Sequence, residues 1–200
     1  MYFLDFLRQL NWVDLFIAIL LIRIGYISVK TGFPIELFKF LGTISSIYFS
    51  CHYYLHLSSF FRAHGPLKAE NWQNFLDFTA FLLLVLLGYL IFFILRKIFG
   101  LLIKVEAVSL LNCWGALMLG VIRWALFASL LLFLASFFNN SYLRSSMKNS
   151  ILSPRLIKLT PATYGGLWNS IMFRFMDEKT FNKAVYRQGN QPSLNQAPLK

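Results

Sequence analysis

Six charged side chains lie within or beside long apolar runs of this 200-residue chain, and they are the first places to look for chemistry. They are Asp14, Arg23, Glu36, Lys39, Asp77 and Arg123. Inserting an ionised side chain into a bilayer costs about 2.5–3.5 kcal/mol on insertion scales, so such residues are candidate functional sites unless they reach water. Asp14, Lys39 and Asp77 lie near the ends of their runs, and extension of these side chains to the lipid headgroups is the alternative for them.

The spacing of these charges limits how they can pair. Glu36 and Lys39 are three residues apart and can form an ion pair on one helix face. Asp14 and Arg23 are nine residues apart, which puts them on opposite faces of one helix. Arg23 and Arg123 therefore need partners on other helices, and Asp14 and Glu36 are the available acids. We predict an interhelical polar network of Arg23, Glu36 and Arg123.

Residues typical of metal or covalent chemistry are sparse. His52 and His56 are four residues apart, which can place two imidazoles on one helix face, but no third ligand lies nearby. Cys51 and Cys113 lie in different apolar segments and are expected to be small buried hydrophobic residues. The sequence has no GxGxxG or Walker loop, no GxSxG elbow and no HExxH motif. We predict no enzymatic activity, catalytic residue, metal or cofactor.

The composition excludes an ordinary soluble domain. Hydrophobic residues make up 58% of the chain and charged residues 14%, and the mean hydropathy is +0.60. Soluble domains carry about 25% charged residues. Four stretches approach the roughly 20 apolar residues that a helix needs to cross a bilayer, namely 12–29, 33–51, 75–95 and 113–138. The sequence predicts an all-α integral membrane protein with about four transmembrane helices, in which 1–138 forms the membrane domain.

The first two predicted spans are separated by a short turn signal. Gly32 permits a turn, and Pro34 suits the first turn of a new helix because its missing N–H is not needed there. Glu36 then lies near the N-terminus of that helix, where the helix dipole favours a carboxylate. The spans at 12–29 and 33–51 are therefore expected to form a tight helical hairpin, which either crosses the bilayer fully or is partly re-entrant.

Two connections between the spans are also predicted from composition. Residues 52–74 are expected to form a polar loop that turns at His64-Gly65-Pro66. Residues 96–112 alternate basic and apolar positions at roughly helical spacing, which predicts an amphipathic segment at the membrane interface.

The segment 139–200 differs from the rest of the chain in charge. It carries nine Lys or Arg and two acidic residues, within a chain whose net charge is +11. We predict a basic tail with a short amphipathic helix at 167–186 and a disordered end at 189–200. Because its charges are scattered among apolar residues, the expected partner of the tail is anionic lipid headgroups rather than nucleic acid.

Small residues mark places where helices can approach closely. Gly25 and Gly32 lie in the first hairpin, and Ala116 and Gly120 form a small-xxx-small pair in the last span. The expected use is helix packing within one chain, and a dimer interface is the alternative.

Several short motifs follow one another in a fixed order along the chain. They are Asn11-Trp12-Val13-Asp14, Arg23-x-Gly25-Tyr26, Lys30-x-Gly32-Phe33-x-x-Glu36-Leu37, Leu41-Gly42, and Leu111-Asn112 followed by Gly115, Gly120 and Arg123. Their order and spacing over residues 5–138 resemble the colicin V production protein family (CvpA) of bacterial inner-membrane proteins. Ser150-x-x-Ser153-Pro154 resembles the segment that follows the last span in that family.

The resemblance implies a multi-pass protein of the bacterial inner (cytoplasmic) membrane. It would support production or export of colicin V or another toxin, and envelope homeostasis, through helix packing and partner contacts. The alternative is a small transporter or channel component that acts as an oligomer, with the charges lining a pathway. Expected partners are the lipid bilayer and either a homo-oligomer or other membrane proteins. The candidate structural or functional residues are Asp14, Arg23, Gly25, Gly32, Glu36, Gly120 and Arg123.

Overall fold

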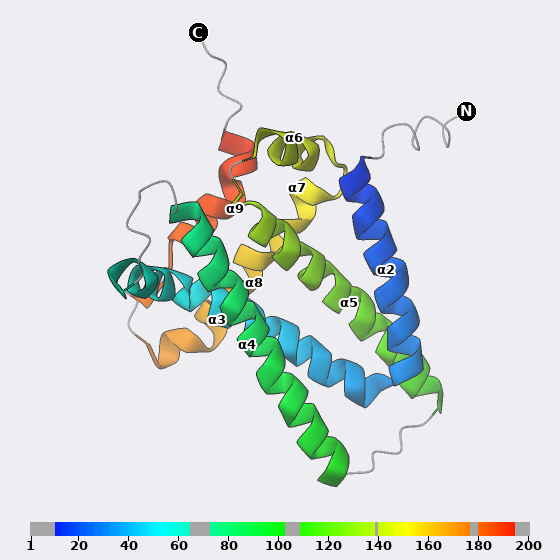
Figure 1. The fold of residues 1–200 in the computed structure, drawn as a ribbon. Helices are drawn as coiled ribbons and strands as arrows, with labels where there is room; N and C mark the ends of the chain where they lie inside the picture. Colours follow the sequence, from blue (N-terminus) through cyan, green and yellow to red (C-terminus); the bar gives the residue numbers. More distant parts are fainter. Residues whose placement is uncertain (1–10, 65–72, 103–108, 139, 177–179, 195–200) are drawn as a thin grey trace, which may run out of the picture.

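The computed structural model describes residues 11–64, 73–102, 109–138, 140–176 and 180–194, and the regular structure in these ranges is helical (Figure 1). The long helices are α2 (Trp12–Thr31), α3 (Phe33–His64), α4 (Gln73–Leu102) and α5 (Ser109–Ala135). Shorter elements follow, namely α6 (Ser141–Asn149), α7 (Ser153–Leu156), α8 (Leu159–Ser170), the 3-10 helix η2 (Met172–Arg174) and α9 (Ala184–Leu194). The prediction of an all-α protein is confirmed for the described residues.

Within the described residues, three helices are long and apolar enough to cross a membrane. These candidate spans are Trp12–Thr31, Gln73–Phe99 and Asn112–Ala135, with mean hydropathies of 2.0, 2.8 and 2.2. They match the first, third and fourth spans predicted from the sequence. The predicted span at 33–51 lies in α3, which is more polar because it buries Glu36, Thr43, Ser46 and Ser50. The predicted count of four spans is not confirmed.

Two predicted connections belong instead to the long helices. The polar loop predicted at 52–74 is wrong for 52–64, because α3 continues to His64 and buries Tyr54 and Ser58 on its inner face. Both ends of the interfacial segment predicted at 96–112 belong to long helices, since α4 continues to Leu102 and α5 begins at Ser109, and its place at the membrane interface stays a prediction. Residues 65–72 and 103–108 lie outside the described ranges.

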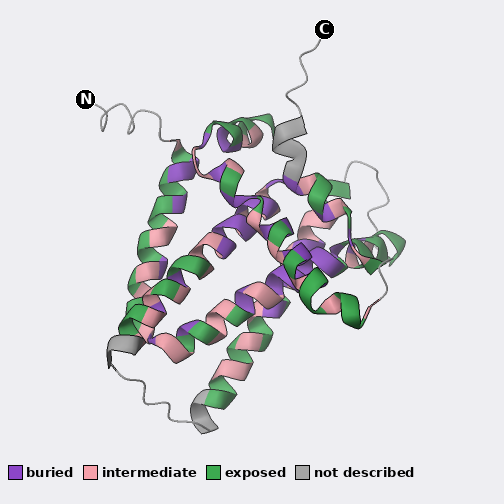
Figure 2. Cartoon of the chain, turned by 180° about the vertical axis from the view of Figure 1, so that it is seen from behind, coloured by how far each residue is buried: buried purple, intermediate pink, exposed green. Residues whose placement is uncertain are grey.

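Helix α3 is the centre of the molecule. It packs against α4, α5 and α8, while α2 packs mainly along α5 (Figure 1). Fully buried side chains from these helices meet in one core cluster, which includes Ile47, Cys51, Phe81, Phe133 and Tyr164. Figure 2 shows the buried turns concentrated where α3, α5 and α8 meet. The end of α3 that carries this core is therefore held from several sides.

The segment that follows α5 packs onto the bundle. Tyr164 and Trp168 of α8 are buried against α3, and Ile157 lies in a second apolar cluster with Val13 and Ile17 of α2. The single helix predicted at 167–186 is wrong, because α8 ends at Ser170 and α9 begins only at Ala184. The prediction of disorder from residue 189 is also wrong up to Leu194, where α9 ends. Residues 195–200 lie outside the described ranges.

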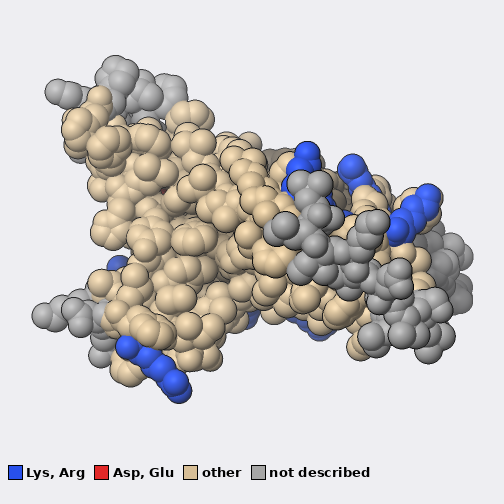
Figure 3. Space-filling view, turned by 90° about the horizontal axis from the view of Figure 1, so that it is seen from below, with Lys and Arg blue, Asp and Glu red and all other residues tan. Residues whose placement is uncertain are grey.

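The outer surface of the long helices is apolar. Helix α4 exposes Leu83, Leu86, Leu87, Leu90, Ile91 and Ile94. In the view of Figure 3, Lys and Arg side chains lie toward the margins of a face whose middle is uncharged. This pattern suits helices whose sides contact lipid and whose ends reach the headgroups.

Two of the close helix contacts in the described structure lie at Gly120 and Gly88, of which only Gly120 was singled out from the sequence. A Cβ atom on Gly120 of α5 would lie 2.6 Å from Cβ of Ser28 on α2. A Cβ atom on Gly88 of α4 would lie 2.7 Å from Cα of Ser46, which is backbone of α3. Gly25 has more room, since the nearest atom to such a Cβ is Leu117 Cδ1 at 3.9 Å.

We expect Gly88→Ala and Gly120→Ala to lower the stability of the protein by about 1–3 kcal/mol each, because the added methyl group must push two helices apart. Gly25→Ala is the matched control and should be neutral or slightly stabilising, since alanine favours helix. Thermal unfolding of the purified protein in mild detergent measures the difference. Equal melting temperatures for Gly88→Ala and Gly25→Ala would contradict the close contact between α3 and α4.

Candidate functional site

The turn between α2 and α3 creates the most polar buried site in the described part of the chain. Gly32 ends α2 with φ +80°, a left-handed conformation that glycine adopts without strain. The side chain of Asn112 on α5 then accepts a hydrogen bond from the backbone N–H of Phe33 at 2.6 Å. A Cβ atom on Gly32 would lie 2.6 Å from the same Asn112 oxygen. The first turn of α3, which carries Glu36, is therefore fixed by α5.

The carboxylate of Glu36 is fully buried and is shared by two cations. Its Oε1 accepts hydrogen bonds from Lys39 Nζ at 2.6 Å and from Thr31 Oγ1 at 2.8 Å. Its Oε2 lies 3.0 Å from Nη2 of Arg123 on α5. We call Thr31, Glu36, Lys39 and Arg123 the Glu36 cluster. It joins α2, α3 and α5 through one carboxylate.

The Glu36 cluster carries one more positive than negative charge. The side chains of Lys39 and Arg123 are 20% and 13% exposed, whereas that of Glu36 is 0% exposed. Arg123 Nε is buried and has no hydrogen-bond partner in the described structure. One carboxylate therefore neutralises only one of the two cations in this apolar environment.

The sequence prediction for this cluster was right for two residues of the proposed network. Arg123 and Glu36 meet, and Lys39 pairs with Glu36 as its spacing predicted. Arg23 takes no part, because Ile24 and Ser28 face α5 and Arg23 points to the exposed side of α2. The partners Thr31 and Asn112 were not singled out as functional residues, although Asn112 belongs to one of the short motifs that resemble those of the family.

Asp14 forms a second buried polar site at the opposite end of α2. Its carboxylate accepts hydrogen bonds from Ser150 Oγ at 2.7 Å and from the backbone N–H groups of Leu152 at 3.0 Å and Ile151 at 3.1 Å. Asn11 adds a bond from its side-chain amide to the carbonyl of Ser146 at 2.7 Å. Asp14 is only 1% exposed. The alternative in which this side chain extends to the headgroups is therefore wrong.

Asp14 brings together the first and last motifs of the sequence. Asn11 and Asp14 come from the opening motif, and Ser150 and Ser153 from the segment after α5. Ser150 Oγ donates to Asp14 and accepts from the N–H of Ser153, so the start of α7 is fixed by α2. No local sequence pattern pairs residues that are 136 positions apart.

The other candidates from the sequence have structural partners. Asp77 accepts hydrogen bonds from Arg62 Nη2 at 2.8 Å and from Ser58 Oγ. His52 is stacked between the rings of Tyr48 and Trp168. Its Nδ1 lies 3.1 Å from the hydroxyl of Tyr164. Among the residues that the structure describes, no three His, Cys, Asp or Glu side chains lie together as a set of metal ligands.

The hydroxyl of Tyr164 joins α3 to the chain that precedes α9. It accepts a hydrogen bond from the N–H of Asn182 at 3.1 Å, and the Asn182 amide donates to the carbonyl of Cys51 at 2.7 Å. Burial raises the pKa of Tyr164 to about 12, so the hydroxyl keeps its proton at neutral pH. The hydroxyl can therefore donate this proton to Nδ1 of His52. The contact between Tyr164 and His52 thus serves to hold α8 against α3.

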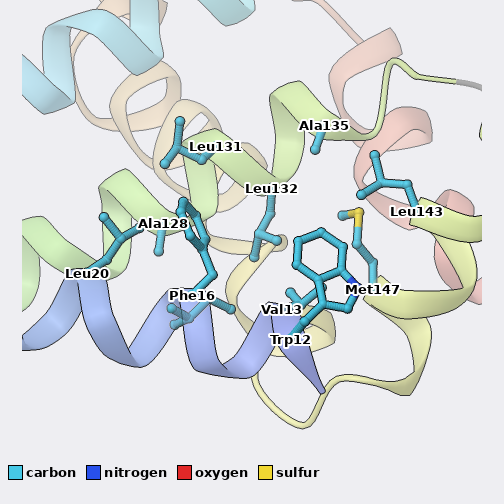
Figure 4. Close-up of a pocket in the computed structure, with 11 residues that line it drawn as sticks. Trp12, Val13, Phe16, Leu20, Ala128, Leu131, Leu132, Ala135, Leu143 and Met147 are labelled. Carbon is cyan, nitrogen blue, oxygen red and sulfur yellow. The ribbon is translucent and has the colours of Figure 1, made fainter. Parts of the chain in front are cut away.

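An apolar groove lies between α2, α5 and α6 (Figure 4). Its walls include Trp12, Phe16 and Leu20 of α2 and Leu131 of α5. Met147 of α6 closes one side. The lining side chains carry no charge, so the groove offers no group for acid–base or nucleophilic chemistry.

The apolar spans, the buried carboxylate with its two cations and the apolar outer faces of the long helices are those of a helical membrane protein. The sequence matches the family described as colicin V production protein over residues 13–161, and the chain belongs to this family. The resemblance found in the motifs is therefore confirmed. The match also extends past residue 138 and includes residues 150–152, which donate hydrogen bonds to Asp14. No curated protein and no solved structure gives a match.

We expect Glu36→Gln to be the most destabilising change in the Glu36 cluster, at about 3–5 kcal/mol, because it leaves two largely enclosed cations without a carboxylate. Arg123→Gln should cost less, since it leaves a neutral Glu36–Lys39 pair. Thermal unfolding in detergent gives the order. If Arg123→Gln destabilised the protein as much as Glu36→Gln, the shared carboxylate would not control the cluster.

Asp14→Asn should lower stability by about 1–3 kcal/mol, because an amide cannot accept all the hydrogen bonds that converge on the carboxylate. The segment around residues 150–157 should then exchange its amide hydrogens faster. Asp77→Asn is the matched control and should cost at most about 1 kcal/mol, since its ion pair with Arg62 is partly exposed. Unchanged exchange at 150–157 in Asp14→Asn would refute the anchoring role.

Proposed function

We propose that this protein is a non-enzymatic, multi-pass protein of the bacterial inner membrane. In this proposal it supports production or export of colicin V or another peptide toxin, and envelope homeostasis, through contacts with membrane partners. Family membership supports the role. The observation that carries the mechanism is the Glu36 carboxylate, which is completely buried and bonded to residues of α2, α3 and α5.

The engagement of these charges favours a structural role over catalysis. Both oxygens of Glu36 already contact cations, and Asp14 accepts from a hydroxyl and from backbone N–H groups. A general base or nucleophile needs a free lone pair directed at a substrate. The described residues place no such group in either the Glu36 cluster or the groove of Figure 4.

The apolar faces of the long helices supply surfaces for partners. On α5, Trp114, Met118 and Ile122 are exposed at successive turns. In the proposal these faces contact the lipid bilayer, a second copy of the chain or another membrane protein. Anionic lipid headgroups contact the basic segment after α5.

A transporter or channel component that acts as an oligomer is the second candidate. It is favoured by the surplus positive charge of the Glu36 cluster and by three buried polar atoms without hydrogen-bond partners in the described structure, namely Arg123 Nε, Ser46 Oγ and Glu36 Oε2, the last of which contacts Arg123 only as an ion pair. Unpaired polar groups inside a membrane domain are a feature of ion and solute pathways.

The proposed role predicts different outcomes for the two arginines of the apolar runs. In a strain that lacks the gene, Arg123→Gln should fail to restore colicin V secretion and resistance to detergent, because the link between α3 and α5 is lost. Arg23→Gln is the matched control and should restore both, since Arg23 is outside the cluster. Membrane levels of both variants are measured by immunoblot. Full rescue by Arg123→Gln would refute the role of the cluster.

Two further measurements separate the candidate functions. Affinity capture in mild detergent, followed by mass measurement of the complex, reports the partners and the oligomeric state. Ion flux through proteoliposomes of the purified protein that disappears in Glu36→Gln would favour the transporter. A monomer without flux that co-purifies with an export protein would favour the partner-contact role.

A further inference from the structure

A pocket between α3 and α4 combines aromatic walls with two cations. The aromatic side chains are Phe38 of α3 and Tyr89, Phe92 and Phe93 of α4, and the cations are Lys39 and Arg96. The cavity has a volume of about 90 Å³. No acidic side chain is among its lining residues in the described structure. This pocket lies beside the Glu36 cluster and is separate from the segment after α5.

The cations of this pocket have capacity for an anion. Lys39 Nζ donates to Glu36 and to Thr31, and an ammonium group has three donors, so one remains. The guanidinium of Arg96 stacks over the Phe93 ring at 5.2 Å and forms no ion pair within the described residues. With the surplus charge of the Glu36 cluster, this side of α3 carries a positive charge that no described carboxylate balances.

The pocket lies at the end of the helices. The candidate span of α4 ends at Phe99, one turn beyond Arg96, and Lys39 lies in the second turn of α3. The end of α2, the start of α3 and the end of α4 lie toward the same end of the bundle (Figure 1). Cations at this position reach the level of the lipid phosphates, while the aromatic side chains beside them are at the level of the acyl chains.

We propose that this pocket binds one anionic phospholipid. Its phosphate contacts Lys39 Nζ and the Arg96 guanidinium, and part of an acyl chain lies against Phe38 and Phe92. A zwitterionic lipid brings a cation of its own and leaves the excess positive charge unbalanced. Free phosphate would not use the aromatic walls. Basic pockets between transmembrane helices bind anionic headgroups by the same chemistry.

The test is native mass spectrometry of the full chain, released from detergent that contains either phosphatidylglycerol or phosphatidylcholine. We expect one tightly bound phosphatidylglycerol and weaker binding of phosphatidylcholine. Arg96→Gln should weaken the binding of phosphatidylglycerol about fivefold, the factor that corresponds to about 1 kcal/mol for one cation near a membrane surface. Lys97→Gln is the matched control, because Lys97 is next in the chain, has the same charge and does not line the pocket.

Lys39→Met is a second variant that keeps the Glu36–Arg123 pair and leaves the cluster neutral, so it should remain folded and also bind phosphatidylglycerol less tightly. Equal losses in Arg96→Gln and Lys97→Gln would overturn the proposal, because they would show general attraction between basic protein and anionic lipid. Displacement of the bound lipid by millimolar inorganic phosphate would also overturn it and point to a site for a soluble anion.

Discussion

The burial of the Glu36 carboxylate is the constraint on which the packing of α2, α3 and α5 depends. Removing a carboxylate from water costs several kcal/mol, so the surrounding groups must supply hydrogen bonds and opposite charge. They come from Thr31 at the end of α2, from Lys39 one turn along α3 and from Arg123 on α5. These groups converge only when the chain turns at Gly32 and Asn112 holds the start of α3. The turn at Gly32 and the packing of the three helices therefore depend on each other.

Polar contacts matter more here than in a soluble protein of this size. Between helices that face lipid, apolar side chains gain little by leaving lipid for protein, so close packing and polar bonds determine which faces meet. Helix α2 illustrates this. Its start is bonded to the segment after α5 through Asp14, its end to α3 through Thr31, and its middle approaches α5 at Gly120. Specific contacts thus hold α2 at its start, its middle and its end.

The sequence predicted the features that depend on the cost of burying charge or exposing apolar groups. Three spans follow from hydropathy, and the meeting of Glu36 with Arg123 follows from the need of an arginine in an apolar run for an acid on another helix, for which the sequence offered Asp14 and Glu36. The length of α3 was missed because a helix that buries a polar face has the composition of a loop. The bond from Ser150 to Asp14 depends on a contact across 136 positions, which no local pattern contains. Arg23 was misplaced because spacing alone does not show which helix face is buried.

The same contacts limit how the protein could act as a transporter. A transport cycle requires the pathway charge to exchange its partners between two states. Glu36 would have to release Arg123, which means separating α3 from α5 while Asn112 of α5 is bonded to the first residue of α3. It would leave one buried carboxylate and one buried arginine to be satisfied by water or substrate. Lys39 can keep Glu36 neutralised during such a step, so Arg123 is the group whose charge would then need a new partner.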